Sequence, residues 1–204
     1  LLKNNNFEIT NNKSDLAIAI GGDGTFINTV HKLNFDTNTY YVGINTGTLG
    51  FLQDINPDHL EGFVNNLNNN NFKTEKIALQ HTEITTNQNK HSCYSLNEIV
   101  VRDNKFKTTH LIVKVNDKLL EEFAGDGLLV STSLGSTAYN ASLEGAMVAF
   151  DINCVQISPI APLVNRVYKS LKQSIILPEK NTITIEPRYE KNNDLLVIVD
   201  GKPE

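Results

Sequence analysis

The fold of the first part of the chain is decided by DLAIAIGGDGTFINTV, residues 15–30. Residues 15–20 form a short, almost continuously apolar run that stops at two glycines, which is typical of a strand buried in a parallel sheet. After Gly24 the apolar residues return at helical spacing, at Phe26, Ile27, Val30 and Leu33. The pattern therefore predicts a buried strand, a glycine-rich loop and a helix in direct succession.

The following residues continue this alternation. Residues 40–44 (YYVGI) predict a second strand. Asn56 suits a helix N-cap and Pro57 the first helical position, and apolar residues then share one helix face at Leu60, Phe63, Val64 and Leu67. The first seventy residues are therefore expected to be of the α/β class.

From Lys73 onward the chain changes to closely spaced segments rich in Ile, Val, Thr and Leu. Asn116 and Asp117 predict a hairpin between two such segments and residues 87–90 predict another turn, which favours antiparallel pairing. One later segment, residues 137–149, is predicted to be helical. Strands are expected within residues 76–86, 94–103, 109–116, 118–123, 154–157, 174–177, 181–186 and 194–200.

This change in sequence pattern predicts a domain boundary near residue 73. We expect an α/β domain over residues 1–73 and an all-β domain over residues 74–204. Both ends are expected to be truncated, because the first strand begins only at residue 15 and the chain stops directly after a strand, at VDGKPE.

Composition limits the kind of protein. The 204 residues are enough for one large or two small domains with real apolar cores. With 18 Lys and Arg against 23 Asp and Glu, the net charge of −5 provides no overall field for nucleic acid or an anionic membrane. Cys93 and Cys154 are far apart, and neither has a second thiol at metal or redox spacing, so the sequence encodes neither a disulfide framework nor a cysteine-based zinc site; no apolar run is long enough to span a bilayer. We expect a soluble, cytoplasmic protein.

The loop GGDGT predicts phosphate chemistry. Its glycines Gly21, Gly22 and Gly24, followed by Thr25 at the start of a helix, let backbone amides approach a phosphate group. Asp23 stands where a cation would be expected, so it either binds Mg²⁺ or accepts the proton of a hydroxyl that attacks phosphorus. Both roles indicate phosphoryl transfer. The alternative is a tight turn with Asp23 as a local cap.

A second glycine-rich segment, NTGTLGFL at residues 45–52, follows the second predicted strand. Ligands of open α/β sheets bind at the carboxyl ends of the strands, so both loops are expected to open on the same crevice. Phe51 is a candidate for stacking on a purine. The alternative for Phe51 is ordinary packing in the core.

Residues 125–140, GDGLLVSTSLGSTAYN, combine an apolar strand with a Gly/Ser/Thr turn that opens a helix. Gly135, Ser136 and Thr137 offer amides and hydroxyls that suit a nucleotide phosphate, a ribose or an adenine edge. A serine hydrolase is excluded, because G-x-S-x-G is absent and the last histidine, His110, precedes the serines. The alternative is a simple Ser/Thr-capped helix.

In this order, GGDGT, NTGTLGF, the Asn97-Glu98 pair, GDGLLVST and GSTAYN resemble the NAD kinase family. IAPLVNRVYKSL at residues 160–171 and the terminal VDG extend the resemblance over nearly the whole chain. It implies a Rossmann-like first domain, a β-sandwich second domain, a homodimer or homotetramer, and phosphorylation of NAD on its adenosine ribose, with ATP or polyphosphate as donor and Mg²⁺ as the divalent metal.

The same resemblance implies roles for single residues. Asp23 resembles the catalytic aspartate that accepts the proton of the adenosine 2′-hydroxyl, and Asn97 and Glu98 resemble the pair that holds this ribose and the adenine. Asp126 resembles a carboxylate near the nicotinamide half. The other positions implied to line the dinucleotide are Gly24, Phe51, Thr137, Ala138, Tyr139, Ser142, Ala161 and Tyr168, with Ala161 and Tyr168 partly across a subunit interface.

The chain departs from the family pattern at Ser133 and Leu134, where the family commonly has Pro and a small hydroxyl residue or Gly. Two alternatives stay open at this stage. A lipid or diacylglycerol-type kinase shares GGDGT and the two-domain layout, but the pair Asn97-Glu98 and GSTAYN speak against it. A catalytically silent NAD(P)-binding sensor is the other alternative, against which the retained Asp23 argues.

Overall fold

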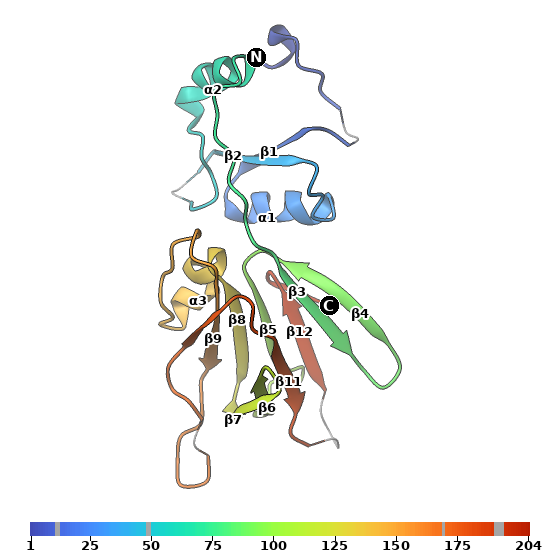
Figure 1. Cartoon of the computed structure of the whole chain (residues 1–204), viewed down its shortest axis with the longest axis vertical. Helices are drawn as coiled ribbons and strands as arrows, with labels where there is room; N and C mark the ends of the chain where they lie inside the picture. Colours follow the sequence, from blue (N-terminus) through green and yellow to red (C-terminus); the bar gives the residue numbers. More distant parts are fainter. Residues whose placement is uncertain (11–12, 48–49, 169, 190–193) are drawn as a thin grey trace. The chain divides into compact units, whose positions relative to one another are not determined.

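The structure is a computed structural model that describes residues 1–10, 13–47, 50–168, 170–189 and 194–204. The chain divides into two compact units, Leu1–Lys76 and Ile77–Glu204. The colours of Figure 1 follow the chain through the first unit and then through the second. Each unit is described by itself below.

The first unit contains a parallel strand pair. β1 (Leu16–Gly21) pairs with β2 (Tyr40–Asn45) from Leu16 opposite Tyr40 to Gly21 opposite Asn45. The helix α1 (Asp23–Lys32) connects the two strands and buries Phe26 and Val30. The predicted succession of strand, glycine-rich loop, helix and strand is therefore confirmed.

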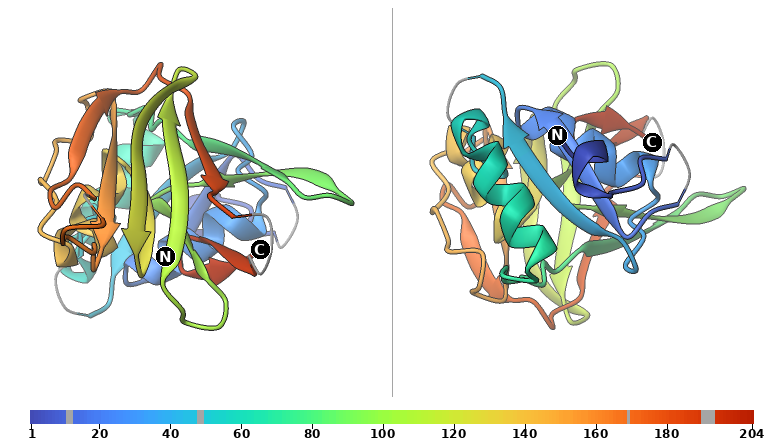
Figure 2. Two further views of the ribbon diagram at one scale, coloured as in Figure 1. Left: turned by 90° about the horizontal axis from the view of Figure 1, so that it is seen from below. Right: turned by 90° about the horizontal axis from the view of Figure 1, so that it is seen from above.

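The remaining elements of this unit are η1 (Lys3–Asn5), η2 (Pro57–His59) and α2 (Leu60–Asn68). As predicted, Asn56 caps the segment that begins at Pro57, since its Oδ1 accepts the N–H of Asp58 at 3.0 Å. Figure 1 and the right-hand view of Figure 2 show α1 and α2 on opposite faces of the β1–β2 pair. This is the layered arrangement of an α/β domain.

In the second unit the described residues form two larger sheets and a separate hairpin. The six-stranded sheet has the order β10-β9-β8-β5-β12-β13, and the three-stranded sheet, in front in the left-hand view of Figure 2, has the order β11-β6-β7. The hairpin pairs β3 (Gln80–Thr85) with β4 (Lys90–Ser95). The strands of the two sheets are β5 (Glu98–Asp103), β6 (Thr109–Val115), β7 (Lys118–Gly125), β8 (Gly127–Thr132), β9 (Cys154–Ile160), β10 (Ile175–Pro178), β11 (Ile183–Pro187), β12 (Leu195–Val199) and β13 (Lys202–Pro203).

Alternating side chains of both sheets form one buried core. The larger sheet contributes Ile99, Val101 and Leu128, while the smaller one contributes Leu111 and Phe123. A core shared by two facing sheets defines a β-sandwich, as expected for the second domain. The predicted hairpin turn at Asn116 and Asp117 is confirmed, since both residues adopt positive φ, 48° and 63°.

The helix predicted over residues 137–149 is wrong beyond Ser142. Only η3 (Leu134–Thr137) and α3 (Tyr139–Ser142) are helical in this region. Glu144 has a φ of 58°, and the backbone of the following residues bonds to side chains instead: Gln156 bonds to Ala146 (2.8 and 3.1 Å) and Ser136 to Val148 (3.0 and 3.2 Å). These side chains replace the hydrogen bonds of a helix.

The predicted strand at residues 94–103 is also interrupted. β4 ends at Ser95 and β5 begins at Glu98, so Leu96 and Asn97 form a bend between two strands. In the described part of the chain, no helix has the length and apolar character required to cross a membrane.

Candidate functional site

Asp23 begins α1 and connects the loops that follow β1 and β2. Its Oδ1 accepts the backbone N–H groups of Phe51 (3.1 Å) and Leu52 (3.0 Å), and its Oδ2 accepts that of Phe51 at 3.1 Å. The loops can meet because parallel strands place their carboxyl ends at the same edge. The structure thus brings together the two glycine-rich segments that the sequence predicts to share a site.

Gly50 permits this approach, and Gly21 permits the turn into α1. A Cβ on Gly50 would lie 2.7 Å from Asp23 Oδ1 and would collide with the side-chain amide of Gln53. Gly21 has a φ of +154°, and a Cβ there would lie 2.8 Å from the Cβ of Thr25. A larger residue at position 50 would push the two loops apart, whereas one at position 21 would displace Thr25 at the start of α1.

The other residues of the predicted phosphate loop form the start of α1. Gly22 is the N-cap, and its carbonyl oxygen accepts the N–H of Thr25 at 2.9 Å. A Cβ on Gly22 or Gly24 would have no atom within 4 Å, so the backbone is open on this side. An open glycine-rich backbone at the N-terminus of a ten-residue helix suits an anionic ligand.

Phe51 is exposed. Its side chain has a relative exposure of 65%, so the alternative that Phe51 belongs to the core is wrong. The backbone N–H of Phe51 is held by Asp23, and its exposed ring is suited to stacking against a planar ligand. Thr48 and Leu49, which belong to the same predicted segment, lie outside the described residues.

Asn97 and Glu98 are buried at the bend between β4 and β5, with exposures of 8% and 7%. The hydroxyl of Thr132, at the end of β8, donates to the carbonyl oxygen of Leu96 at 2.6 Å, and its N–H donates to that of Asn97 at 2.9 Å. The backbone of Gly135 lies so close to Asn97 that a Cβ on Gly135 would be 2.6 Å from the Cα of Asn97. The pair is therefore held in a fixed conformation.

The carboxyl group of Glu98 is electrostatically unusual. Burial, and next the charge of Asp200, raise its pKa to about 7 from an ordinary 4.5, against a hydrogen bond from the backbone N–H of Tyr139. Oε2 of Glu98 is buried and has no partner among the described residues. Near neutral pH this group can therefore be a hydrogen-bond donor as well as an acceptor.

The candidates of the GSTAYN segment lie beside this pair. Tyr139 is 41% exposed, so it is not a core residue, and Ser142 is also exposed. Thr137 and Ala138 are half-buried at the junction of η3 and α3. The backbone contact from Tyr139 to Glu98 joins the two motifs.

One residue of this segment has a supporting role that the sequence does not indicate. Asn140 is fully buried; its Nδ2 donates to the carbonyl oxygen of Ser136 at 3.3 Å, and its Oδ1 accepts the hydroxyl of Ser158 at 2.6 Å. Ser133, a departure from the family pattern, donates to the carbonyl oxygens of Ile152 and Cys154 (3.3 Å). These bonds attach the segment to β9.

Asp126, Ala161 and Tyr168 lie at the opposite end of the sandwich. Asp126 precedes β8, and its N–H donates to the carbonyl oxygen of Ile160 at 2.9 Å, directly before Ala161. Glu98 is opposite Ser131 at the other end of β8, so about 17 Å of strand separates the two groups. Within one chain the structure does not bring these three residues to Glu98.

Tyr168 belongs to an aromatic cluster at this second end. Its ring centroid lies 5.4 Å from that of His110, which also contacts Tyr189 at 5.5 Å. The adjoining Lys169 lies outside the described residues. Among the residues that the structure describes, no three His, Cys, Asp or Glu side chains are grouped so that they could hold a metal ion.

The chain matches two family models. The ATP-NAD kinase N-terminal domain matches residues 5–72, and the ATP-NAD kinase C-terminal domain matches residues 96–204. A curated relative, the NAD kinase of Finegoldia magna, is 38% identical over 189 residues, which cover 90% of this chain and 68% of the relative.

Two solved structures have a similar fold. Yeast NADH kinase complexed with NADH gives a TM-score of 0.82 at 24% identity, over 95% of this chain and 55% of that one. An NAD kinase from Archaeoglobus fulgidus in complex with ATP gives a TM-score of 0.76 at 26% identity, over 93% of this chain and 70% of that one. The chain thus spans 55% to 70% of the length of these three proteins.

Proposed function

The chain belongs to the NAD kinase family, a family of phosphotransferases, and from this premise we propose that it transfers the γ-phosphoryl group of ATP to the 2′-hydroxyl of the adenosine ribose of NAD, giving NADP. The observation that carries the proposal is the Asp23 carboxylate, fixed by the amides of Phe51 and Leu52 beside an open glycine-rich helix N-terminus.

In the proposed reaction Asp23 is the general base. The 2′-oxygen forms a bond to the γ-phosphorus, the bond from this phosphorus to the β–γ bridging oxygen breaks, and ADP leaves. The proton of the 2′-hydroxyl passes to the Asp23 carboxylate. The backbone of Gly22 and Gly24 is the proposed contact for the phosphates, which the amides of a helix N-terminus suit.

We assign Asn97 and Glu98 to the adenosine half of NAD. An amide and a carboxyl group whose pKa is raised to about 7 offer both donors and acceptors to a ribose and an adenine. Thr137, Ala138, Tyr139 and Ser142 are proposed to line the dinucleotide beside them, and Phe51 to stack on the adenine.

The proposed nicotinamide contacts come from a second copy of the chain. Asp126, Ala161 and Tyr168 lie at the far end of β8 from Glu98, and the intervening strands are packed in the core. A homodimer or homotetramer that places this end beside the Glu98 end of a neighbour would complete the site. Sedimentation of the protein with and without NAD tests the assembly.

The proposed divalent cation is Mg²⁺ that enters with the phosphates. Mg²⁺ keeps several waters and is often held by substrate phosphates with one or two carboxylates, so it does not need a cage of protein ligands. This fits the described residues, which offer no group of three metal-ligating side chains. The bound ion would neutralise charge on the triphosphate.

The test is NADP formation by the full chain from NAD, ATP and Mg²⁺, with NAD binding followed in the same samples. Parallel reactions replace ATP by polyphosphate, NAD by NADH or a diacylglycerol, and Mg²⁺ by EDTA. Metal-dependent NADP formation is the expected result. Binding without turnover would indicate a sensor, and phosphorylation of the diacylglycerol a lipid kinase; either would overturn the proposal.

A further inference from the structure

The residues VDG at the end of β12 form a turn whose aspartate faces the Asn97-Glu98 pair. Asp200 and Gly201 connect β12 to β13 with φ angles of 46° and 79°, the left-handed values of a two-residue hairpin turn. The N–H of Asp200 donates to the carbonyl oxygen of Glu98 at 3.1 Å. The turn therefore continues the pairing of β12 with β5 up to Glu98.

The carboxylate of Asp200 accepts three consecutive backbone N–H groups. Oδ2 accepts that of Leu96 at 2.9 Å, and Oδ1 accepts those of Asn97 at 2.7 Å and Glu98 at 3.2 Å. A hairpin turn of this type requires only a residue that tolerates positive φ, and asparagine fulfils that requirement equally well. An aspartate differs from an asparagine here because both of its carboxylate oxygens are acceptors, so it can accept all three N–H groups.

These contacts complete the hydrogen bonding of the bend. Asp200 takes the N–H groups of residues 96–98, and Thr132 takes the carbonyl oxygens of Leu96 and Asn97. With its backbone groups occupied in this way, the bend presents the side chains of Asn97 and Glu98 as its groups for a ligand. The carboxyl group of Glu98, buried beside Asp200, has an oxygen without a partner among the described residues.

We propose that Asp200 is a positioning residue for NAD, acting through the backbone of Asn97 and Glu98 and through the negative charge that it places beside the Glu98 carboxyl group. This inference rests on the proposed function, because it takes the pair as the adenosine contact. Asp200 itself is not assigned a contact with NAD.

The charge effect has a defined direction. Asp200 favours the protonated, hydrogen-bond-donating form of Glu98, whereas the N–H of Tyr139 favours the ionised form. Burial, then the charges of Glu204 and Asp200, raise the pKa of the Cys93 thiol on β4. Within four positions of the Asp200–Gly201 turn and of the bend at residues 96–98, the titratable or charged side chains are Cys93, Tyr94, Glu98, Arg102, Asp200, Lys202 and Glu204.

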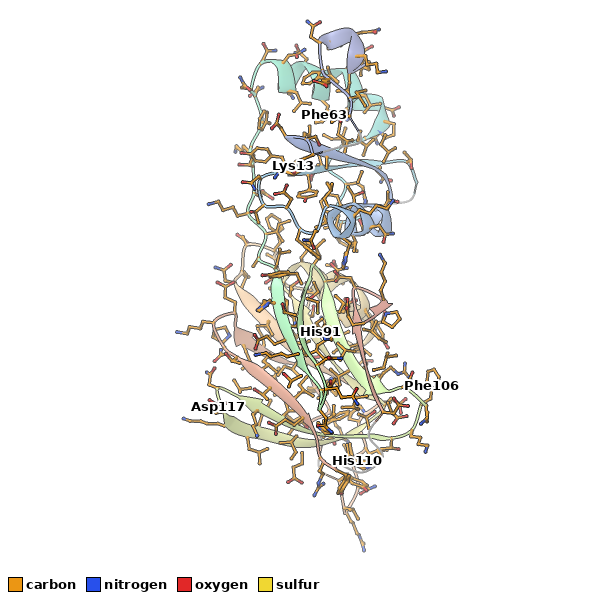
Figure 3. All side chains as sticks on the ribbon, turned by 90° about the vertical axis from the view of Figure 1, so that its right-hand side faces the viewer. Lys13, Phe63, His91, Phe106, His110 and Asp117 are labelled. Carbon is orange, nitrogen blue, oxygen red and sulfur yellow. The ribbon has the colours of Figure 1, made fainter. Side chains whose placement is uncertain are left out.

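The experiment compares Asp200→Asn with the wild type over a pH series, using NADP formation and NAD binding. The matched control is Asp117→Asn, the same change at another left-handed turn position, at the tip of the β6–β7 hairpin (Figure 3). Asn at position 200 retains the turn but directs an N–H group toward a backbone N–H donor. We expect the KM for NAD to rise about tenfold with a small change in kcat, and Asp117→Asn to match the wild type.

The pH profile separates positioning from a purely structural role. NAD affinity is expected to fall as Glu98 ionises, because the ionised carboxylate can no longer donate a hydrogen bond. Without the Asp200 charge Glu98 ionises more readily, so this loss of affinity should move to lower pH by about one unit. Asp200→Glu retains the charge but displaces the carboxylate. Its KM for NAD should therefore rise, while the pH at which NAD affinity is lost on the alkaline side should not change. This variant also decides the matter if Asp200→Asn does not fold.

An active wild type with an unchanged KM and pH profile in Asp200→Asn would overturn the positioning role. An inactive wild type would instead overturn the proposed function. In that case the titration of Glu98, followed by carbon-13 NMR of its carboxyl group in both proteins, still tests the charge effect. A Glu98 titration that does not move to lower pH in Asp200→Asn would reject it.

Discussion

Both carboxylate oxygens of Asp23 lie 3.1 Å from the backbone nitrogen of Phe51. The contact joins residues 28 positions apart and connects the loop after β1 with the loop after β2. Asp23, the proposed base, therefore also holds the loop that carries Phe51, the proposed stacking residue. Substitutions at the two residues should have separable effects.

Replacing Asp23 by Asn should lower kcat by about 10² to 10⁴, because the amide cannot accept the proton and directs an N–H group toward that of Phe51. Asp58→Asn, the same change in the first turn of η2, is the control and should retain activity. The measurement is initial-rate kinetics at saturating NAD. A kcat within tenfold of the wild type would refute the base role.

Replacing Phe51 by Ala should raise the KM for NAD by about tenfold or more, because stacking of a base on an aromatic ring contributes about 1–3 kcal/mol. The free energy of unfolding should change by no more than about 0.5 kcal/mol, since the ring is exposed. Phe106→Ala, at an 80% exposed ring of the second unit, is the control. Equal KM values for both variants would show that Phe51 does not stack.

The pKa of Glu98 predicts a pH dependence of stability. The unfolded chain releases this proton near pH 4.5 and the folded chain near pH 7, so the folded state holds an extra proton between these values and its stability falls as pH rises through them. The contribution is on the order of 3 kcal/mol, because one pH unit corresponds to about 1.4 kcal/mol.

Glu98→Gln should remove this dependence, since glutamine stays neutral. Urea unfolding at pH 5 and pH 8 should show a smaller loss of stability in the variant than in the wild type. Glu83→Gln, which changes an exposed carboxylate paired with Lys90 at 3.1 Å, is the control and should lose stability as the wild type does. An equal loss in all three proteins would contradict the prediction.

Replacing Gly135 by Ala should destabilise the second unit by about 1–3 kcal/mol, because the new methyl group would collide with the backbone of Asn97. Gly62→Ala, inside α2 with no atom within 4 Å of the added Cβ, should instead stabilise the first unit by up to about 1 kcal/mol. Urea denaturation of both variants measures the difference. A neutral Gly135→Ala would show that the bend tolerates displacement.

Local signals in the sequence account for much of the fold. The apolar run ending at two glycines predicts β1 and its loop, and Asn56 with Pro57 predicts the start of η2, because strand burial and helix capping depend on neighbouring residues. The hairpin at Asn116 and Asp117 is predictable for the same reason, since its left-handed backbone is a property of those two residues.

Contacts between distant residues account for what the sequence does not predict. Residues 143–149 have a helical pattern, but side chains of Ser136 and Gln156 hold their backbone in another conformation. The carboxylate of Asp200 meets Asn97 across 103 positions. Sequence motifs predict which residues contact NAD, but only the register of β8 shows that Asp126 and Glu98 lie at opposite ends of one strand.

The separation of Asp126 from Glu98 along β8 has a consequence for chains that carry a substitution at either residue. If each site combines Glu98 of one copy with Asp126 of its neighbour, a mixed dimer of Glu98→Ala and Asp126→Ala chains contains one site with both defects and one site with none. Two inactive preparations should therefore recover part of the wild-type activity when unfolded and refolded together. In a cell, two differently defective alleles would complement each other, although neither encodes a working enzyme.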